Sequence, residues 1–136
     1  MIVAMNHFTV IAEDERKTLD FYTGLLGLTV GHRPDLGFAG AWLYADGPHA
    51  LLHVYFDRPV PAQRAGVIDH MAFTATDLPA TVAKLEKAKI KYELRRLPAE
   101  GVRGGLWQLF FDDPHGGKVE FDFDKDEAAP KGYAAA

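Results

Sequence analysis

Three histidines and one glutamate are the side chains of this sequence best suited to chemistry: His7, His53, His70 and Glu120. Imidazole nitrogen combined with carboxylate oxygen suits Fe(II), Mn, Ni, Co or Zn, whereas Ca and Mg prefer shells made of oxygen alone. Polar groups of this kind are costly to bury unless they are paired. If the four share one place, a divalent metal would satisfy them all; the alternative is that each is an ordinary core or surface residue.

The spacing of these residues follows an internal repeat. The segment 6–10, Asn-His-Phe-Thr-Val, matches 69–73, Asp-His-Met-Ala-Phe, at an offset of 63 positions. The segment 51–54, which carries His53, similarly matches 118–121, which carries Glu120. A repeat of this length is a whole supersecondary unit, and such a unit cannot bury its apolar face alone. We therefore expect two related modules that pack together or against another chain.

The module boundaries follow from composition. Residues 57–66 hold two prolines and few apolar side chains, which is typical of a linker. Residues 125–136 lack periodicity and end in three alanines, which predicts a flexible C-terminal tail. The first module is therefore expected at 1–56 and the second at 67–124.

Each module is predicted to fold as a strand, a helix and three further strands. Residues 5–11 and 67–74 are rich in strand formers, and Asp14 and Asp77 are suited to capping the helices that follow. The remaining strands are expected near 28–33, 40–45, 49–56, 91–96, 106–112 and 117–124. The predicted fold class is α+β, with two tandem βαβββ modules forming a curved mixed β-sheet cup and helices on its outer face.

Strand alternation places the candidate residues on one face of this sheet. Successive strand residues point to opposite faces, so His53 lies opposite Leu52 and Val54, and Glu120 lies opposite Val119 and Phe121. The apolar face must cover the helices. The other face therefore carries the three histidines and the glutamate, one on each of four strands at matched depth.

Composition excludes several classes of protein. The 136 residues contain no cysteine, which rules out a disulfide framework, a cysteine metal site and a cysteine nucleophile. No apolar run approaches the ~20 residues that cross a bilayer, and a net charge of −4 gives no attraction for nucleic acid or anionic membranes. The N-terminal residues lack the pattern of an export signal, so we expect a cytoplasmic location.

Two motifs carry a resemblance to a known family. Residues 21–30, Phe-Tyr-Thr-Gly-Leu-Leu-Gly-Leu-Thr-Val, and 113–121, Asp-Pro-His-Gly-Gly-Lys-Val-Glu-Phe, resemble the first-helix and closing signatures of the vicinal oxygen chelate superfamily. This superfamily includes glyoxalase I, extradiol dioxygenases, bleomycin and fosfomycin resistance proteins and methylmalonyl-CoA epimerase. The resemblance covers about residues 5–124 and implies the paired βαβββ fold.

The resemblance implies that His7, His70 and Glu120 are metal ligands, because they match the set shared by most metal-dependent members. His53 occupies the fourth position, where glyoxalase I typically has glutamate. It resembles the acid/base histidine of extradiol dioxygenases, in which two His and one Glu hold Fe(II). Whether His53 is a ligand or an acid/base residue stays open.

The leading hypothesis is a dioxygenase that cleaves a catechol-like vicinal diol at non-haem Fe(II), with Zn, Ni, Mn or Co as alternative metals. One alternative is a glyoxalase I- or epimerase-like lyase or isomerase. Another is a non-catalytic small-molecule binding dimer of the bleomycin-resistance type. Trp42, Tyr44, Tyr55 and Trp107 are candidates for stacking on the substrate. We also expect a homodimer, with the site in one chain or shared between two.

Overall fold

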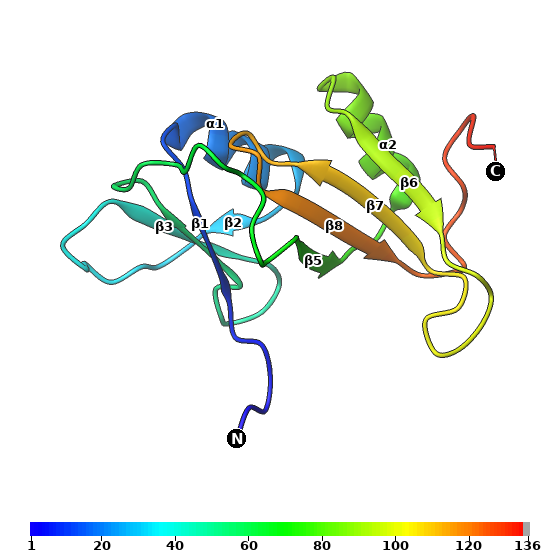
Figure 1. Cartoon of the computed structure of the whole chain (residues 1–136), viewed down its shortest axis with the longest axis horizontal. Coiled ribbons are helices and arrows are strands. Elements are labelled where there is room, and N and C mark those ends of the chain that lie inside the picture. The colour runs from blue at the N-terminus through cyan, green and yellow to red at the C-terminus, as the bar shows by residue number, and fades with distance from the viewer. Residues whose placement is uncertain (135–136) are drawn as a thin grey trace. The chain divides into compact units, whose positions relative to one another are not determined.

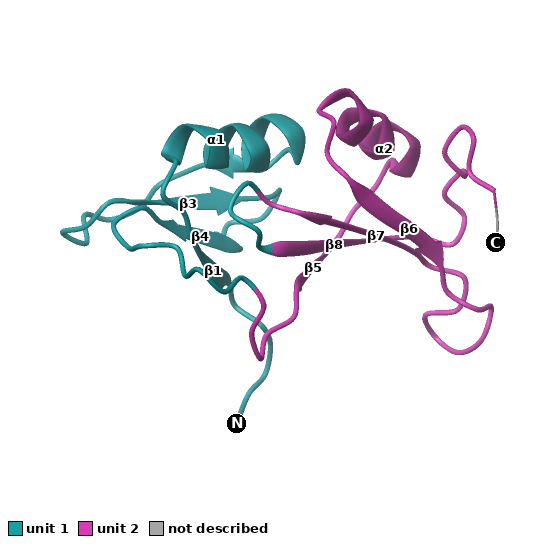
Figure 2. Cartoon of the chain, turned by 45° about the horizontal axis from the view of Figure 1, so that its top comes forward, with its two compact units in different colours: residues 1–64, 114–117 teal, residues 65–113, 118–136 magenta. Residues whose placement is uncertain are grey.

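A computed structural model describes residues 1–134, which form two compact units (Figure 2). Unit 1 contains residues 1–64 and 114–117, and unit 2 contains residues 65–113 and 118–136. Each unit holds a four-stranded mixed sheet with a helical segment over one face (Figure 2). The predicted α+β class with two βαβββ modules is confirmed.

The sheet of unit 1 has the strand order β1-β4-β3-β2. Figure 1 labels three of these strands, β1, β2 and β3. Its elements are β1 (Phe8–Ile11), α1 (Glu15–Leu19), η1 (Asp20–Leu25), β2 (Thr29–Val30), β3 (Gly40–Tyr44) and β4 (Leu52–Tyr55). Strands β1 and β4 pair in parallel, because the chain makes a crossover through the helix and two strands before it returns beside β1. The other pairs are antiparallel.

The first helix begins where the sequence predicts and then widens. The side chain of Asp14 accepts from the backbone N–H of Lys17 at 2.9 Å, which caps α1. From Asp20 the helix continues as the π-helical segment η1, in which the N–H of Leu26 reaches the carbonyl of Phe21 at 3.0 Å. The segment is followed by Gly27, whose φ of +81° suits glycine and stops the helix.

Unit 2 repeats this plan with the strand order β5-β8-β7-β6. Its elements are β5 (Met71–Thr74), α2 (Leu78–Lys87), β6 (Tyr92–Arg96), β7 (Trp107–Asp112) and β8 (Lys118–Phe123). Strands β5 and β8 pair in parallel, with Ala72 opposite Glu120. Asp77 caps α2 by accepting from the N–H of Ala80, and Pro79 lies in the first turn, where its missing N–H costs no helical bond.

The buried core of each unit lies on the helix side of its sheet. In unit 1 Leu43, Leu52 and Val54 are buried together with Tyr22 from η1. In unit 2 the corresponding layer is formed by Leu85 from α2 and by alternate residues of the strands, namely Leu109, Phe111, Val119, Phe121 and Phe123. Because successive strand residues alternate, His53, between Leu52 and Val54, and Glu120, between Val119 and Phe121, lie on the opposite face.

Two segments differ from expectation. The turn at 114–117, predicted to lie inside the second module, belongs to unit 1, where the N–H of Asp14 donates to Nε2 of His115 at 3.3 Å. The linker at 57–66 is divided, with residues 57–64 in unit 1.

The C-terminal segment at 125–134 packs within unit 2, where the sequence predicts a flexible tail. Glu127 accepts from the N–H groups of Asp77 and Leu78, and Tyr133 packs edge-on against Trp107 at 5.0 Å. Residues 135–136 of the expected tail lie outside the described residues. Within residues 1–134, no helix is both long enough and apolar enough to span a bilayer.

Candidate functional site

In unit 1 the two candidate histidines form one stack with a tryptophan. The rings of His7 and His53 are 3.8 Å apart and nearly parallel, and the ring of Trp42 lies 4.3 Å from that of His53 at an angle of 10°. His53 pairs with Thr9 on β1 and with Trp42 on β3, so the three strands bring these side chains to the face away from the helix. His53 is therefore held between His7 and Trp42.

The surroundings of His53 favour its neutral form. Burial lowers the pKa of His53, and the neighbouring charges of His7 and Arg33 lower it further. His53 is 9% exposed, and no residue in the range 1–134 forms a hydrogen bond with its ring nitrogens. The ring is thus fixed by stacking while its nitrogen atoms stay available to a ligand.

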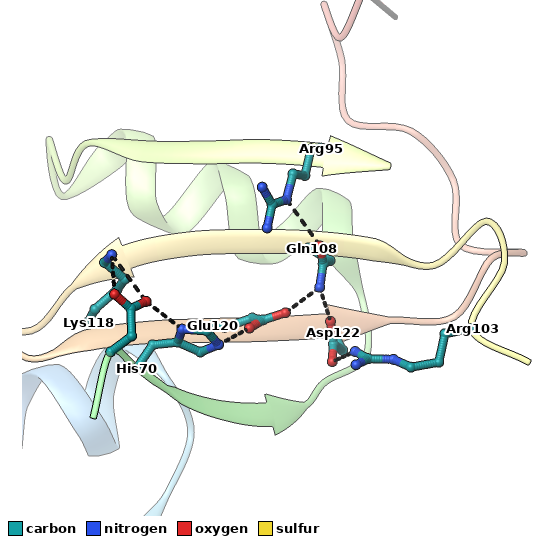
Figure 3. Close-up of polar contacts among 8 residues, drawn as sticks. His70, Arg95, Arg103, Gln108, Lys118, Glu120 and Asp122 are labelled. Atoms are coloured by element: carbon teal, nitrogen blue, oxygen red, sulfur yellow. Dashed lines mark hydrogen bonds and ion pairs between the residues drawn. The ribbon is translucent and has the colours of Figure 1, made fainter. Parts of the chain in front are cut away.

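In unit 2 the other two candidates are in direct contact (Figure 3). Nε2 of His70 lies 2.6 Å from Oε2 of Glu120. Glu120 is 4% exposed, whereas the side chain of His70 is one-third exposed. A buried carboxylate oxygen and an imidazole nitrogen therefore meet at the same point, and both are atoms that bind transition metals.

Both candidate ligand histidines are oriented by the residue that precedes them. Nδ1 of His7 lies 2.7 Å from Oδ1 of Asn6, and Nδ1 of His70 lies 2.7 Å from Oδ2 of Asp69. Since both partners are acceptors, Nδ1 carries a proton in each ring. Nε2 of His7 then carries the lone pair, whereas Nε2 of His70 meets Oε2 of Glu120 and shares a proton with it until a cation takes that place. A metal-ligating histidine is typically held in this way, with the second ring nitrogen donating to a carboxylate or carbonyl oxygen.

The orienting carboxylate of Asp69 is itself stabilised as an anion. The hydrogen bond from His70 lowers the pKa of Asp69, and Lys118, at 3.4 Å, adds to the effect. Asp69 is exposed, so its role here is the orientation of His70 and not a large contribution to stability.

Gln108 on β7 holds the other oxygen of Glu120 (Figure 3). Its amide nitrogen donates to Oε1 of Glu120 at 2.5 Å and lies 3.4 Å from Oδ1 of Asp122. Its amide oxygen accepts from Nε of Arg95 on β6 at 3.0 Å. Arg103 pairs with Asp122 at the end of the same row. Glu120 is thus fixed at both oxygens, one by Gln108 and one by His70.

The pKa of Glu120 depends on its burial and on the charged side chains around it. Burial raises the pKa of Glu120, and the adjacent carboxylate of Asp122 raises it further, while His70 and Arg103 act in the opposite direction. A buried carboxylate that is disfavoured as an isolated anion is one that a bound cation would stabilise.

Two of the aromatic candidates, Tyr55 and Tyr44, lie on the sheet face that carries His53 and Trp42. Tyr55 shares the face of His53 and packs edge-on against Phe38 at 5.1 Å, with the guanidinium of Arg58 4.3 Å from its ring. Tyr44 shares the face of Trp42, and its hydroxyl donates to the carbonyl of His32 at 2.7 Å. Tyr55 and Tyr44 therefore remain on the face expected for them.

The expected position of Trp107 is wrong. Trp107 pairs with Phe123 in β8, is 2% exposed and lies on the helix side, where the guanidinium of Arg96 covers its ring at 4.9 Å. Because successive strand residues alternate, its neighbour Gln108 occupies the face of Glu120 instead. Trp107 is a core residue and not a substrate contact.

The candidate ligands thus form two pairs, His7 with His53 in unit 1 and His70 with Glu120 in unit 2. Within residues 1–134, no three His, Asp or Glu side chains gather into a group that could hold a metal ion. The donor chemistry of His70 and Glu120, with Nδ1 of His70 already held, fits half of a transition-metal site.

Gln108 and Asn6 were not among the site residues predicted from the sequence. A signal for Gln108 was present, because it is a polar residue inside an otherwise apolar strand and its position alternates with those of Trp107 and Leu109. Asn6 and Asp69 occupy the same position in the repeat and both carry a side-chain oxygen, which also pointed to a shared role.

Comparison with known proteins assigns the family. The model of the Glyoxalase/Bleomycin resistance protein/Dioxygenase superfamily matches residues 4–121, and the chain belongs to this superfamily. The chain is similar to Glyoxylase I 4 of Arabidopsis thaliana, with 32% identity over 123 residues that cover 88% of this chain and 70% of that protein.

Two solved structures show the same fold. One is the fosfomycin resistance protein FosX of Listeria monocytogenes, with a TM-score of 0.68, 16% identity and coverage of 91% of this chain and 95% of that one. The other is TnmS3, an antibiotic binding protein of Streptomyces sp. CB03234, with a TM-score of 0.64, 20% identity and coverage of 90% and 96%. Members of the superfamily are mostly enzymes, generally use a divalent metal, bind small molecules and commonly form dimers.

Proposed function

We propose that the protein is a metal-dependent enzyme that acts on a small molecule through two neighbouring oxygen atoms, with His7, His70 and Glu120 as the metal ligands. The observation that carries the proposal is the contact of His70 Nε2 with Glu120 Oε2 at 2.6 Å, made while Asp69 holds Nδ1 of the same ring. The Nδ1 of His7 is held in the same way by Asn6, which supports His7 as the third ligand.

The chemistry divides between the metal and the chain. When bound, a divalent metal polarises a carbonyl or hydroxyl oxygen of the substrate and favours its negative form. His53 accepts the proton that the substrate loses, since its ring is fixed by stacking and its nitrogen atoms are not engaged by the chain. Trp42 keeps the ring of His53 in place and, with Tyr55, forms an aromatic wall for the substrate.

The first candidate reaction is of the glyoxalase type, in which a base removes a proton from a carbon next to a carbonyl group. The similarity to Glyoxylase I 4 across most of this chain supports it. In this reaction His53 takes the proton from one carbon and returns it to the neighbouring one, so that the substrate is isomerised with no net loss of atoms.

The second candidate is cleavage of a catechol-like diol with O2 at Fe(II). It is supported by the two-histidine, one-carboxylate ligand set and by the placement of a further histidine, His53, on a strand between them in sequence. His53 would accept a phenolic proton from the diol and later donate it to an oxygen atom of the product.

Metal analysis of the freshly purified protein tests the ligand set. We expect about one Fe, Mn, Ni, Co or Zn ion per site, and at least tenfold less in His70→Ala and Glu120→Ala. His115→Ala serves as the control, because His115 lies in the turn at 114–117 and is outside the proposed ligand set. Wild-type protein that contains no metal and takes up none on addition would remove the proposal and leave a binding role of the bleomycin-resistance type.

His53→Ala separates an acid/base role from a ligand role. As an acid/base residue its loss slows turnover by about 100-fold or more while the metal content is retained. As a ligand its loss lowers the metal content together with turnover. His53→Gln, which keeps a polar side chain of similar length, distinguishes loss of the proton acceptor from loss of packing against Trp42.

Two assays then separate the candidate reactions. Thioester formation from methylglyoxal and glutathione, in protein loaded with Ni, Co or Zn, identifies the glyoxalase type. Oxygen consumption on addition of catechols to protein loaded anaerobically with Fe(II) identifies the dioxygenase.

We also propose a homodimer, and a mixing experiment tests whether the ligands come from one chain. His7→Ala and Glu120→Ala are each expected to be inactive alone. If one ion takes ligands from two copies, a mixed dimer regains a complete ligand set at one of its two sites. If each chain supplies its own ligands, mixing restores nothing.

A further inference from the structure

Arg33 is a half-buried cation without a carboxylate partner among residues 1–134. Its nitrogens Nε and Nη2 are buried and have no hydrogen-bond partner, and no residue in the range 1–134 forms an ion pair with it. The nearby Arg58 is different, because its Nε lies 3.7 Å from the carboxylate of Asp57. Buried donors without partners are costly, so an unpaired guanidinium indicates a missing acceptor.

The guanidinium of Arg33 is held in a defined position. It lies over the ring of Phe38, with Cζ 4.8 Å from the ring centre, and its Nη2 would be 3.1 Å from a Cβ atom at Gly40. The same Cβ atom would lie 2.6 Å from the carbonyl oxygen of Val54, so the glycine admits both the neighbouring strand and the guanidinium. The contact with Phe38 offsets part of the cost of burying the charge but supplies no hydrogen-bond acceptor.

This position is on the same face of unit 1 as His53. Gly40 and Trp42 are two residues apart on β3 and so point to one face, and they pair with Tyr55 and His53 of β4. The charge of Arg33 acts on His53, where it contributes to the lowered pKa. The guanidinium of Arg33 lies over Phe38, and Phe38 packs edge-on against Tyr55, which is two residues from His53 on the same face of β4. Arg33 and His53 therefore line one surface.

Trp42 supplies a second unpaired donor on this face. Its indole Nε1 is buried and has no hydrogen-bond partner among the described residues. The ring itself is fixed against His53 at 4.3 Å. Two donor groups without acceptors, one of them charged, thus lie on the face that carries His53.

We propose that Arg33, together with the indole N–H of Trp42, forms a subsite for an oxyanion of the substrate, with a planar carboxylate as the group that fits best. The fork of two guanidinium nitrogens matches the two oxygens of a carboxylate, and an arginine gains most from such a pair where water is excluded. Under the proposed function, on which this assignment of substrate class rests, the reacting molecule carries a negative group beside the oxygens that the metal would bind.

Binding of benzoate to the full-length protein in excess chelator tests the subsite without the metal. The readouts are the NMR signals of the indole N–H of Trp42, assigned with Trp42→Phe, and of the Arg33 side chain. We expect saturable shifts of both signals with benzoate. The neutral isostere benzamide is expected to bind at least tenfold more weakly.

Variants of the two arginines identify the group that binds. Arg33→Met is expected to weaken benzoate binding at least tenfold, and Arg33→Lys, which keeps the charge without the fork, to give an intermediate loss. Arg58→Met removes a neighbouring cation that already has a carboxylate partner and is expected to change binding less than twofold. Spectra of each variant show whether the fold is retained.

Phenylphosphonate identifies the source of the oxyanion. Tighter binding than benzoate, still dependent on Arg33, supports the subsite and assigns it to phosphonates or phosphates. Failure of both anions to bind, equal binding of benzamide, or unchanged binding in Arg33→Met overturns the proposal. Because no metal is present, these results are independent of whether His7, His70 and Glu120 hold an ion, which the metal analysis decides separately.

Discussion

Glu120 is oriented by a row of hydrogen-bonded side chains. Arg95, at the other end of the row, determines which atoms along it donate and which accept. Nε of Arg95 can only donate, so it fixes the oxygen of the Gln108 amide toward itself and turns the NH2 group toward Glu120. A residue on β6 thereby determines which oxygen of a carboxylate on β8 is left for His70. The row lies on three adjacent strands of one sheet, which makes it a rigid support.

Replacement of Gln108 by Leu is expected to weaken metal binding by about 10- to 100-fold, because loss of an outer hydrogen bond releases the ligating carboxylate. Competition against a fluorescent chelator measures the affinity. Glu93→Ala is the matched control, since Glu93 lies on the same face of β6, two residues from Arg95 and outside the row. Equal affinity in Gln108→Leu and wild type would show that the row does not support the ligand.

For individual residues, the sequence predicted the residue types of the site and the sheet face that they occupy better than it predicted their contact partners. The repeat placed His53 and Glu120 at corresponding positions, and the structure puts each on the face away from its helix. The error at Trp107 arose because the register of β7 against β8 depends on the turn at 113–117, which strand propensity does not determine. Arg33 lies in an irregular loop, where no periodicity predicts the direction of a side chain.

Among the secondary-structure elements, α2 has the least usual beginning. Asp77 caps it from a left-handed backbone conformation, with φ of 63° and ψ of 61°, and its own N–H donates to Glu127 at 2.8 Å. Asparagine and aspartate tolerate this conformation better than most residues do. The helix therefore depends on a residue type that satisfies both the backbone and the cap.

Replacement of Asp77 by Ala is expected to destabilise the protein by about 1–2 kcal/mol, since the cap bond to Ala80 is lost. Asp77→Asn, which keeps the side-chain oxygen and tolerates the left-handed conformation, should stay within about 0.5 kcal/mol of wild type. Chemical denaturation followed by circular dichroism measures both. A variant Asp77→Ala as stable as wild type would contradict the assigned cap.

The contact between α2 and β6 is expected to weaken at alkaline pH. Burial raises the pKa of Tyr92, and the carboxylate of Glu86, which accepts from its hydroxyl at 2.9 Å, raises it further. The folded state thus holds the phenolic proton more tightly than the unfolded state does. This contribution is complete below pH 10 and is lost as the pH rises through the raised pKa.

Melting temperatures of wild type and Tyr92→Phe between pH 8 and 11 test this linkage. Wild type is expected to lose more stability over this range than Tyr92→Phe, so that the difference in melting temperature between the two narrows above about pH 10. A difference that stays constant over the whole range would show that Tyr92 does not titrate differently in the folded state.

The strands were predicted within a few residues of their observed bounds, because alternation and turn residues are local signals. Two features were not local. One is the π-helical turn at Asp20–Leu25, in which Phe21 and Tyr22 are both buried. The other is the packing of the segment at 125–134, where Glu127 accepts from the start of α2. Neither is contained in the periodicity of its own segment.

At the scale of the whole molecule, the two units share the chain in an interleaved order. The chain passes from unit 1 to unit 2 at 64–65, returns for residues 114–117 and leaves again. The hairpin of β7 and β8 is therefore closed by four residues that belong to the other unit. Cutting the chain between the modules would remove a part of unit 1.

We expect the two units to unfold in one transition, because neither is continuous in the chain. Each contains one of the two tryptophans, Trp42 in unit 1 and Trp107 in unit 2. In Trp42→Phe and in Trp107→Phe, the urea midpoint from fluorescence should equal that from circular dichroism of the same variant. Separate midpoints by the two probes in either variant would show independent units.

The neighbours of the two ligand histidines are alike in shape and unlike in charge. Asn6 offers His7 a neutral amide oxygen, whereas Asp69 offers His70 a carboxylate. A carboxylate draws the ring proton more strongly, which leaves the opposite nitrogen of His70 richer in electrons than that of His7. The two imidazoles at corresponding positions of the repeat are consequently unequal Lewis bases, and nitrogen-15 spectra would resolve them as distinct signals.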